Sequence, residues 1–226
     1  MNEIKKQRNS VIELLRILCI LMVSAGHDYT HGIAYRRVPY VYETYSLRIL
    51  AMQLISFGAD IANDLFIIVT GYYMINSAIK GKRIFKLFAQ MLFYAWLIVC
   101  IFHITGIHPL VGEPLKKALL PFWSGENWFV TCYLLLCLFI PFLNPFLKTL
   151  EQKQFIKLLV LLFIIHFVTP LFGTKSFWSV KHGLEQFIIL YFIGAFIRLH
   201  GFKTKFLQNK WCQRGILFII PHTFGK

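Results

Sequence analysis

Six long apolar runs, separated by short segments that hold most of the Lys and Arg residues, constrain the fold of this chain more than any other feature. Each run has roughly 17 to 21 residues, which is enough to cross a bilayer as a helix. We predict spans near residues 10–28, 60–78, 84–104, 128–147, 155–172 and 185–201. A seventh begins near Gly215, and we expect the chain to stop within it. The predicted fold is therefore an all-α, polytopic transmembrane bundle with six full spans and a truncated seventh.

The basic residues predict the orientation of these spans. Segments 1–9, 78–83, 148–157 and 198–214 carry three, three, three and five Lys or Arg residues. The alternate segments 28–47, 105–127 and 173–184 carry two each. Because cytoplasmic loops are enriched in Lys and Arg, we predict a multi-pass protein of the cell membrane with a cytoplasmic N-terminus. The net charge of +14 is explained by this topology, so we expect the lipid bilayer and not nucleic acid as a partner.

The first apolar run carries two polar groups that we predict to share one helix face. Arg16 and His27 are eleven residues apart, which turns a helix to within about 20° of its starting face over a rise of roughly 16 Å. Ionisable groups in a span usually face the bundle interior or a watery cavity. His27 is a candidate general base and Arg16 a candidate ligand for a phosphate or carbonyl oxygen. Alternatively, Arg16 extends to the interface beside Glu13, and His27 only marks the helix end.

A metal site is not predicted. His27 and His31 have the i, i+4 spacing that can bind zinc on a helix, but no third ligand is evident. Of the five cysteines, four lie inside apolar runs and none forms a Cys-x-x-Cys pair. These cysteines are therefore interpreted as small buried hydrophobic residues.

Polar residues around position 60 suggest where the second span begins. We expect residues 48–57 to form a separate short interfacial or re-entrant helix, because about ten residues are too few to span. Gly58, Asp60, Asn63 and Asp64 would then open the second span, since acidic and amide groups favour a helix N-terminus. In the predicted topology this start lies at the same membrane face as His27. Asp64 is therefore a candidate to orient the imidazole.

Three further groups of residues are candidates for binding. Lys80, Lys82, Arg83 and Lys86 form a cytoplasmic cluster that either sets the topology or binds the phosphates of a nucleotide-like donor. Trp128 and Tyr133 are explained as interfacial aromatic residues at the start of the fourth span. His166 and Glu185 lie in or beside spans and could line a cavity.

Four of these segments, in this order, resemble motifs of the type 3 integral-membrane acyltransferases, which O-acylate cell-surface sugars. The first is the stretch from Arg16 to His27, an Arg and a His separated by ten residues. The second runs from Asp64-Leu65-Phe66 to Thr70-Gly71-Tyr72, with Thr70 in place of the usual Ser. The third is Arg83 with Lys86, where the family has two Arg residues. The fourth comprises the helices with Trp128-Phe129-Val130 and with Leu190-Tyr191-Phe192-Ile193-Gly194. The family normally has about ten spans, so residues 1–226 would form the N-terminal part of one such domain.

The resemblance implies a transferase that moves an acyl group, commonly acetyl, from acyl-CoA to a hydroxyl of a polysaccharide or glycolipid. Acyl-CoA would be a substrate loaded from the cytoplasm, with no bound cofactor. His27 and Asp64 would be catalytic, and Arg16, Arg83, Lys86 and Trp128 would contact the donor or substrate. Two alternatives remain open. One is a transport or flippase module, although the prolines of the fourth span have no counterpart in a second half. The other is a truncated remnant without activity.

Overall fold

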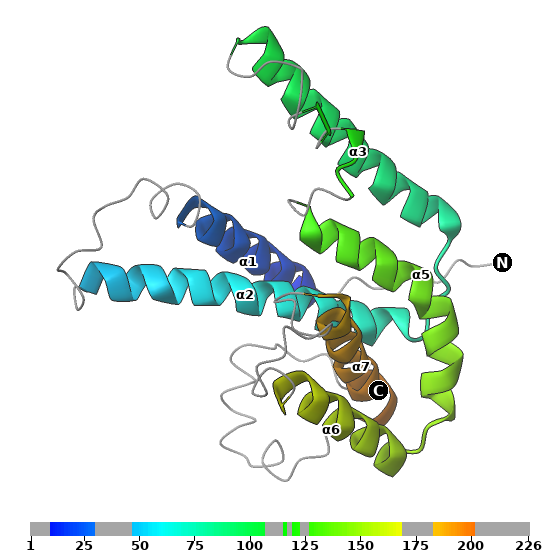
Figure 1. Cartoon of the computed structure of the whole chain (residues 1–226). Helices are drawn as coiled ribbons and strands as arrows, with labels where there is room; N and C mark the ends of the chain where they lie inside the picture. Colours follow the sequence, from blue (N-terminus) through cyan, green and yellow to red (C-terminus); the bar gives the residue numbers. More distant parts are fainter. Residues whose placement is uncertain are drawn as a thin grey trace. The chain divides into compact units, whose positions relative to one another are not determined.

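The computed structural model describes residues 10–29, 47–106, 115–116, 119–122, 127–168 and 183–201. These residues form helices and no strand (Figure 1). The helices are α1 (Ser10–His27), α2 (Leu47–Met74), α3 (Gly81–Ile104), α5 (Trp128–Thr149), α6 (Gln152–Val168) and α7 (Leu184–His200). The chain divides into two compact units, with boundaries between Val69 and Thr70 and between His200 and Gly201. Each unit is described by itself below.

The all-helical fold is confirmed for the described residues, and five of the six helices have bounds close to those predicted. Among the described helices, α3 and α5 are long and apolar enough to cross a membrane. The complete six-span bundle is therefore not confirmed. The predicted seventh span, from Gly215 onward, lies outside the described residues, as does the basic segment 1–9.

The prediction for the second span was wrong. Residues 48–57 do not form a separate helix, because α2 runs without a break from Leu47 to Met74. Gly58 and Asp64 are therefore interior residues of α2 and do not open it. A single glycine costs a helix only about 1 kcal/mol, and no proline interrupts this stretch. The apolar residues before Gly58 consequently continue the helix.

In the first unit, α1 and the first part of α2 run beside each other in opposite directions (Figure 1). They meet through small residues. Gly26 lies so close to Ala59 that a Cβ atom on the glycine would collide with the alanine side chain. A Cβ on Gly58 would lie 2.9 Å from Cε of Met22. Small residues of this kind allow apolar helices to approach closely without polar contacts.

In the second unit, α5 bends partway along its length (Figure 1). Pro141 and Pro145 both lie inside this helix. Each proline lacks the N–H that would bond to the carbonyl one turn earlier, and its ring clashes with that carbonyl. The two prolines therefore account for the bend, and the helix continues to Thr149 despite them.

Helix α7 packs against both α5 and α6. Its buried residues Phe187, Tyr191 and Phe192 lie along one side of the helix. On the α6 side, the buried ring of Phe155 contacts Phe192 and also Phe196, with ring centroids 6.3 Å and 5.4 Å apart. Offset and edge-to-face ring contacts of this type favour a defined packing of the helices. Helix α7 is thus the central element of the second unit.

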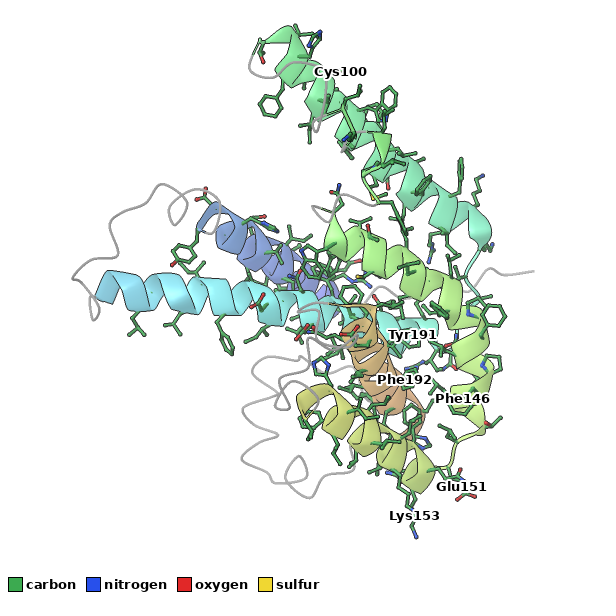
Figure 2. The ribbon with its side chains drawn as sticks, viewed as in Figure 1. Cys100, Phe146, Glu151, Lys153, Tyr191 and Phe192 are labelled. Carbon is green, nitrogen blue, oxygen red and sulfur yellow. The ribbon has the colours of Figure 1, made fainter. Side chains whose placement is uncertain are left out.

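Large apolar side chains cover the outward faces of the helices. They project from α3 on all sides in Figure 2, and Met91 is the buried residue of that helix. Phe85 and Phe93 are 69% and 61% exposed. Soluble proteins rarely leave apolar patches of this extent uncovered. We therefore interpret these faces as surfaces for lipid or for further helices.

Candidate functional site

Arg16 and His27 lie on the same unbroken helix, α1, and both side chains are exposed. The shared face that the sequence predicts requires this continuity. Cys19, which is 2% exposed, marks the side of α1 that packs inward. On an ideal helix Arg16 and His27 lie about 60° and 80° from Cys19. Both polar groups are therefore at the margin of the packed face, accessible from outside it.

The contact between Gly26 and Ala59 shows which residues of α2 share a side with His27. His27 is one position after Gly26, and Asp60 is one position after Ala59, so each is rotated about 100° from the contact. In two antiparallel right-handed helices these rotations lead to the same side of the pair. We call this side, which carries Arg16, His27 and Asp60, the polar side of the α1–α2 pair.

Asp64 also lies on the polar side, but not where the sequence predicted it. It is five residues after Ala59, roughly 8 Å further along α2 and about 140° around it. It therefore lies between the levels of His27 and Arg16, and the interpretation of Asp64 as a helix-start residue was wrong. Asp60, which the sequence predicts only as one of the residues that open the second span, is the carboxylate at the level of His27. The orienting role of Asp64 toward His27 stays a prediction.

In the second unit, a buried hydrogen-bonded cluster joins the end of α2 to α5 and α7. Asn144, 8% exposed, donates from Nδ2 to the carbonyl oxygen of Met74 at 2.9 Å. The buried hydroxyl of Tyr191 donates to Oδ1 of Asn144 at 2.6 Å. A Cβ atom on Gly71 would collide with the carbonyl oxygen of Tyr191, so only glycine fits this position. The cluster satisfies its own polar groups and is structural in character.

The candidate donor-binding cations Arg83 and Lys86 lie exposed in the first turns of α3. The Arg83 guanidinium is near enough to Cys137 of α5 to act on it electrostatically. A further cation is held in place at the end of α7. Arg198 lies over the ring of Tyr72, 5.0 Å from its centroid, and donates from Nη1 to the tyrosine hydroxyl at 3.1 Å. A stacked and hydrogen-bonded guanidinium is well suited to bind an anion with its remaining N–H groups.

Trp128 lies at the first position of α5 and belongs to an aromatic cluster with the start of α7. Its ring contacts that of Phe187 edge-to-face, with the two centroids 6.2 Å apart. The ring of Phe129 also contacts that of Phe187, with a centroid distance of 5.3 Å. Phe129 also stacks on Tyr133 at 6.5 Å. The interpretation of Trp128 as a purely interfacial residue is therefore incomplete, because the side chain also packs between two helices.

A comparison with protein families shows the family to which the chain belongs. A model of the family described as Acyltransferase domain matches residues 9–225, nearly the whole chain. The chain belongs to the type 3 acyltransferase family. The resemblance inferred from the sequence motifs is thereby confirmed. No curated protein and no solved structure matches the chain.

The structure gives physical reasons for two motifs of this acyltransferase-family chain. The Gly71 of the second motif permits the close approach of α2 to the backbone of Tyr191, which belongs to the fourth. The first motif places Arg16 and His27 on the polar side of the α1–α2 pair. His31, the second residue of the predicted zinc pair, lies outside the described residues.

Three residues with defined contacts or placement were not singled out from the sequence. Asn144 could have been found, because an amide between two prolines in an apolar helix needs a partner. The sequence indicates only a topological role for Arg198, because its contact with Tyr72 joins residues 126 positions apart and leaves no local pattern. Asp60 was misplaced together with the start of α2.

Proposed function

We propose that the chain transfers an acyl group, acetyl in the simplest case, from acyl-CoA to a hydroxyl group of a cell-surface polysaccharide or glycolipid. Membership of the acyltransferase family supports transferase chemistry. The single observation that carries the proposal is the polar side of the α1–α2 pair. There, a largely apolar helix exposes an imidazole and a guanidinium.

His27 acts as the general base in this proposal. The neutral imidazole removes the proton of the acceptor hydroxyl while that oxygen attacks the thioester carbonyl. The carbon–sulfur bond breaks, and CoA leaves as the thiolate, which takes up a proton. A carboxylate near His27 stabilises the imidazolium that forms. Asp64 was the predicted partner, and Asp60 lies closer to the level of His27.

Arg16 binds the donor from the cytoplasmic side. The rise of roughly 16 Å between Arg16 and His27 separates a phosphate or carbonyl contact from the point of acyl transfer. The extended pantetheine arm of CoA spans such a distance along the helix. Arg83 and Lys86 provide further cations for the phosphates, and Trp128 an aromatic contact for the donor or acceptor.

The replacement His27→Ala tests the proposal. The full-length protein, produced in its own membrane, is supplied with acetyl-CoA labelled in the acetyl group, and label is measured in isolated surface glycans. We expect transfer to fall by about a hundredfold or more, the usual contribution of a general base. His103→Ala is the matched control, because His103 is an exposed histidine at the end of α3.

Equal labelling by the parent protein and His27→Ala would overturn the assignment of His27. Absence of labelling by the parent protein itself, when it is inserted and folded, would overturn the transferase function. Uptake or translocation of the glycan without acetylation would favour the transport alternative.

A further inference from the structure

The starts of α5 and α7 hold two buried oxygen atoms that have no hydrogen-bond partner. They are Oγ1 of Thr131, on α5, and Oε1 of Glu185, on α7. Both helix starts are brought together by the contacts of Phe187 with Trp128 and Phe129. A buried acceptor without a partner is disfavoured in a folded protein, and each such atom needs an explanation. Two of them at one helix junction point to a ligand that supplies the missing donors.

The position of the Glu185 carboxylate depends on a glycine. A Cβ atom on Gly183 would collide with the carboxylate oxygens of Glu185. Because glycine has no side chain, the Glu185 carboxylate can occupy this space. The same carboxylate is near enough to Cys132, the neighbour of Thr131 on α5, to act on it electrostatically. The carboxylate is therefore held at the α5–α7 junction and does not extend away from it.

The chemistry of the junction restricts the ligand. A carboxylate can only accept hydrogen bonds when ionised, and a threonine hydroxyl without a partner can accept as well as donate. An anionic ligand would be repelled by Glu185. Aromatic rings beside the acceptors, those of Trp128 and Phe187, provide an apolar wall. Sugar rings combine hydroxyl donors with an apolar C–H face and fit this arrangement.

We propose that the junction of α5 and α7, with Glu185, Thr131 and Trp128, is a binding site for the hydroxyl groups of a sugar ring. The Glu185 carboxylate accepts hydrogen bonds from one or two ring hydroxyls. The Thr131 hydroxyl forms a second hydrogen bond with the sugar, and the Trp128 ring packs on a C–H face of the sugar. The ligand's role as the acyl acceptor rests on the proposed function. Binding of a sugar at this site does not.

The test measures binding directly on the purified full chain in detergent micelles. Methyl glycosides of glucose, galactose and mannose are the probes, and saturation-transfer NMR reports contact and affinity. The matched ligand control is the fully O-methylated form of each glycoside, which keeps the ring but has no hydroxyl donor. We expect at least one methyl glycoside to bind and its O-methylated form to fail.

Three replacements locate the binding. We expect Glu185→Gln to weaken binding about tenfold, because hydrogen bonds to charged groups are the strong ones. Thr131→Val should weaken it about fivefold while leaving the thermal unfolding midpoint unchanged or raised, since it removes a hydroxyl without a partner. Gly183→Ala should weaken binding by displacing the carboxylate. Glu151→Gln, just beyond the other end of α5 (Figure 2), is the matched control and should bind as the parent does.

Thr131→Val separates a ligand site from a structural role. A residue that only stabilised the fold would lower the unfolding midpoint when replaced, and binding would follow folding. The proposal is overturned if no methyl glycoside binds, if the O-methylated forms bind equally well, or if Glu185→Gln and Thr131→Val bind as the parent does. Displacement of the glycoside by tetramethylammonium would identify a cation site instead and would also overturn it.

The proposed function fails separately. If the glycosides bind as expected but the folded, full-length protein transfers no acetyl group from labelled acetyl-CoA, the sugar site stands and the transferase assignment falls. If transfer occurs but the three replacements leave the KM for the acceptor unchanged, the transferase assignment stands and the role of this site in binding the acceptor falls.

Discussion

The Asn144 cluster of the second unit and the polar side of the α1–α2 pair in the first unit differ in the burial of their polar side chains. In the second unit, Asn144 and Tyr191 are buried and hydrogen-bonded to each other at 2.6 Å. In the first unit, Arg16 and His27 are exposed on a largely apolar helix. A buried group with all its partners stabilises a fold. A polar group exposed on a helix of this kind contributes little to stability, which accords with the functional role proposed for Arg16 and His27.

The contacts that hold the helices together differ in the same way. The α1–α2 pair meets through Gly26, Ala59 and Gly58, which approach closely without polar groups. The end of α2 meets α7 through Gly71 and is also fixed by the Asn144 cluster. Replacement of Gly71 or of residues in the Asn144 cluster should therefore reduce the stability of the protein. Replacement on the polar side of the α1–α2 pair should reduce activity with little effect on stability.

The largest expected effect on stability is that of Gly71→Ala. The new Cβ atom would collide with the backbone of Tyr191, which cannot move aside as a flexible side chain could. We expect the free energy of unfolding to fall by about 3 kcal/mol or more, at or above the upper end for overpacked sites. Equilibrium unfolding in mixed detergent micelles measures it.

Gly81→Ala is the control for this prediction. A Cβ atom on Gly81 meets nothing within 4 Å, and the residue begins α3. The replacement should be neutral or stabilise by up to about 1 kcal/mol, because alanine is the better helix former. Equal destabilisation by both replacements would show that the close approach of α2 and α7 does not limit stability.

Asn144→Leu should have the next largest effect. It leaves the hydroxyl of Tyr191 without its acceptor and removes one of the two hydrogen bonds that the carbonyl of Met74 accepts, the other coming from the N–H of Ser77. We expect a loss of about 2 kcal/mol in the free energy of unfolding, the usual cost of leaving buried polar groups unsatisfied. Adding Tyr191→Phe should recover part of the loss, because the stranded hydroxyl is then removed. A double replacement that costs the full sum of the two single ones would contradict the cluster as a cooperative unit.

Asp60→Asn and Asp64→Asn compare the two carboxylates of the polar side. Because Asp60 lies at the level of His27 and Asp64 roughly 8 Å further along α2, we expect Asp60→Asn to lower acyl transfer more, by about tenfold. Neither replacement should change the free energy of unfolding by as much as Asn144→Leu does. The labelled acetyl-CoA assay ranks them. A larger loss for Asp64→Asn would restore Asp64 as the partner of His27.

The helices and the shared face of Arg16 and His27 could be predicted because both depend on local periodicity. Apolar runs set the helix bounds, and a rotation of about 100° per residue sets the face. The start of α2 was wrong because acidic and amide residues are favourable at a helix start but are also tolerated inside a helix. Asp64 is interpreted from the sequence as a residue of a helix start, whereas it is one of the acidic residues that are tolerated inside a helix.

Contacts between distant residues could not be predicted in the same way. Tyr191 and Asn144 are 47 positions apart, and Arg198 and Tyr72 are 126 apart. Such pairs depend on the packing angles of whole helices, and the bend of α5 at Pro141 and Pro145 changes those angles. A sequence pattern carries no information on them beyond the need of Asn144 for a partner.

Tyr72→Phe should have the smallest effect on stability, and it decides to which class Arg198 belongs. The replacement keeps the ring under the guanidinium and removes only the hydrogen bond of 3.1 Å. Because Arg198 is exposed, we expect a loss below about 1 kcal/mol in the free energy of unfolding. Arg198→Gln should then leave stability nearly unchanged but raise the KM for acyl-CoA several-fold, since it removes a cation that could bind the donor phosphates. If Arg198→Gln instead destabilises as strongly as Asn144→Leu with an unchanged KM, Arg198 belongs with the structural cluster and not with the groups kept for function.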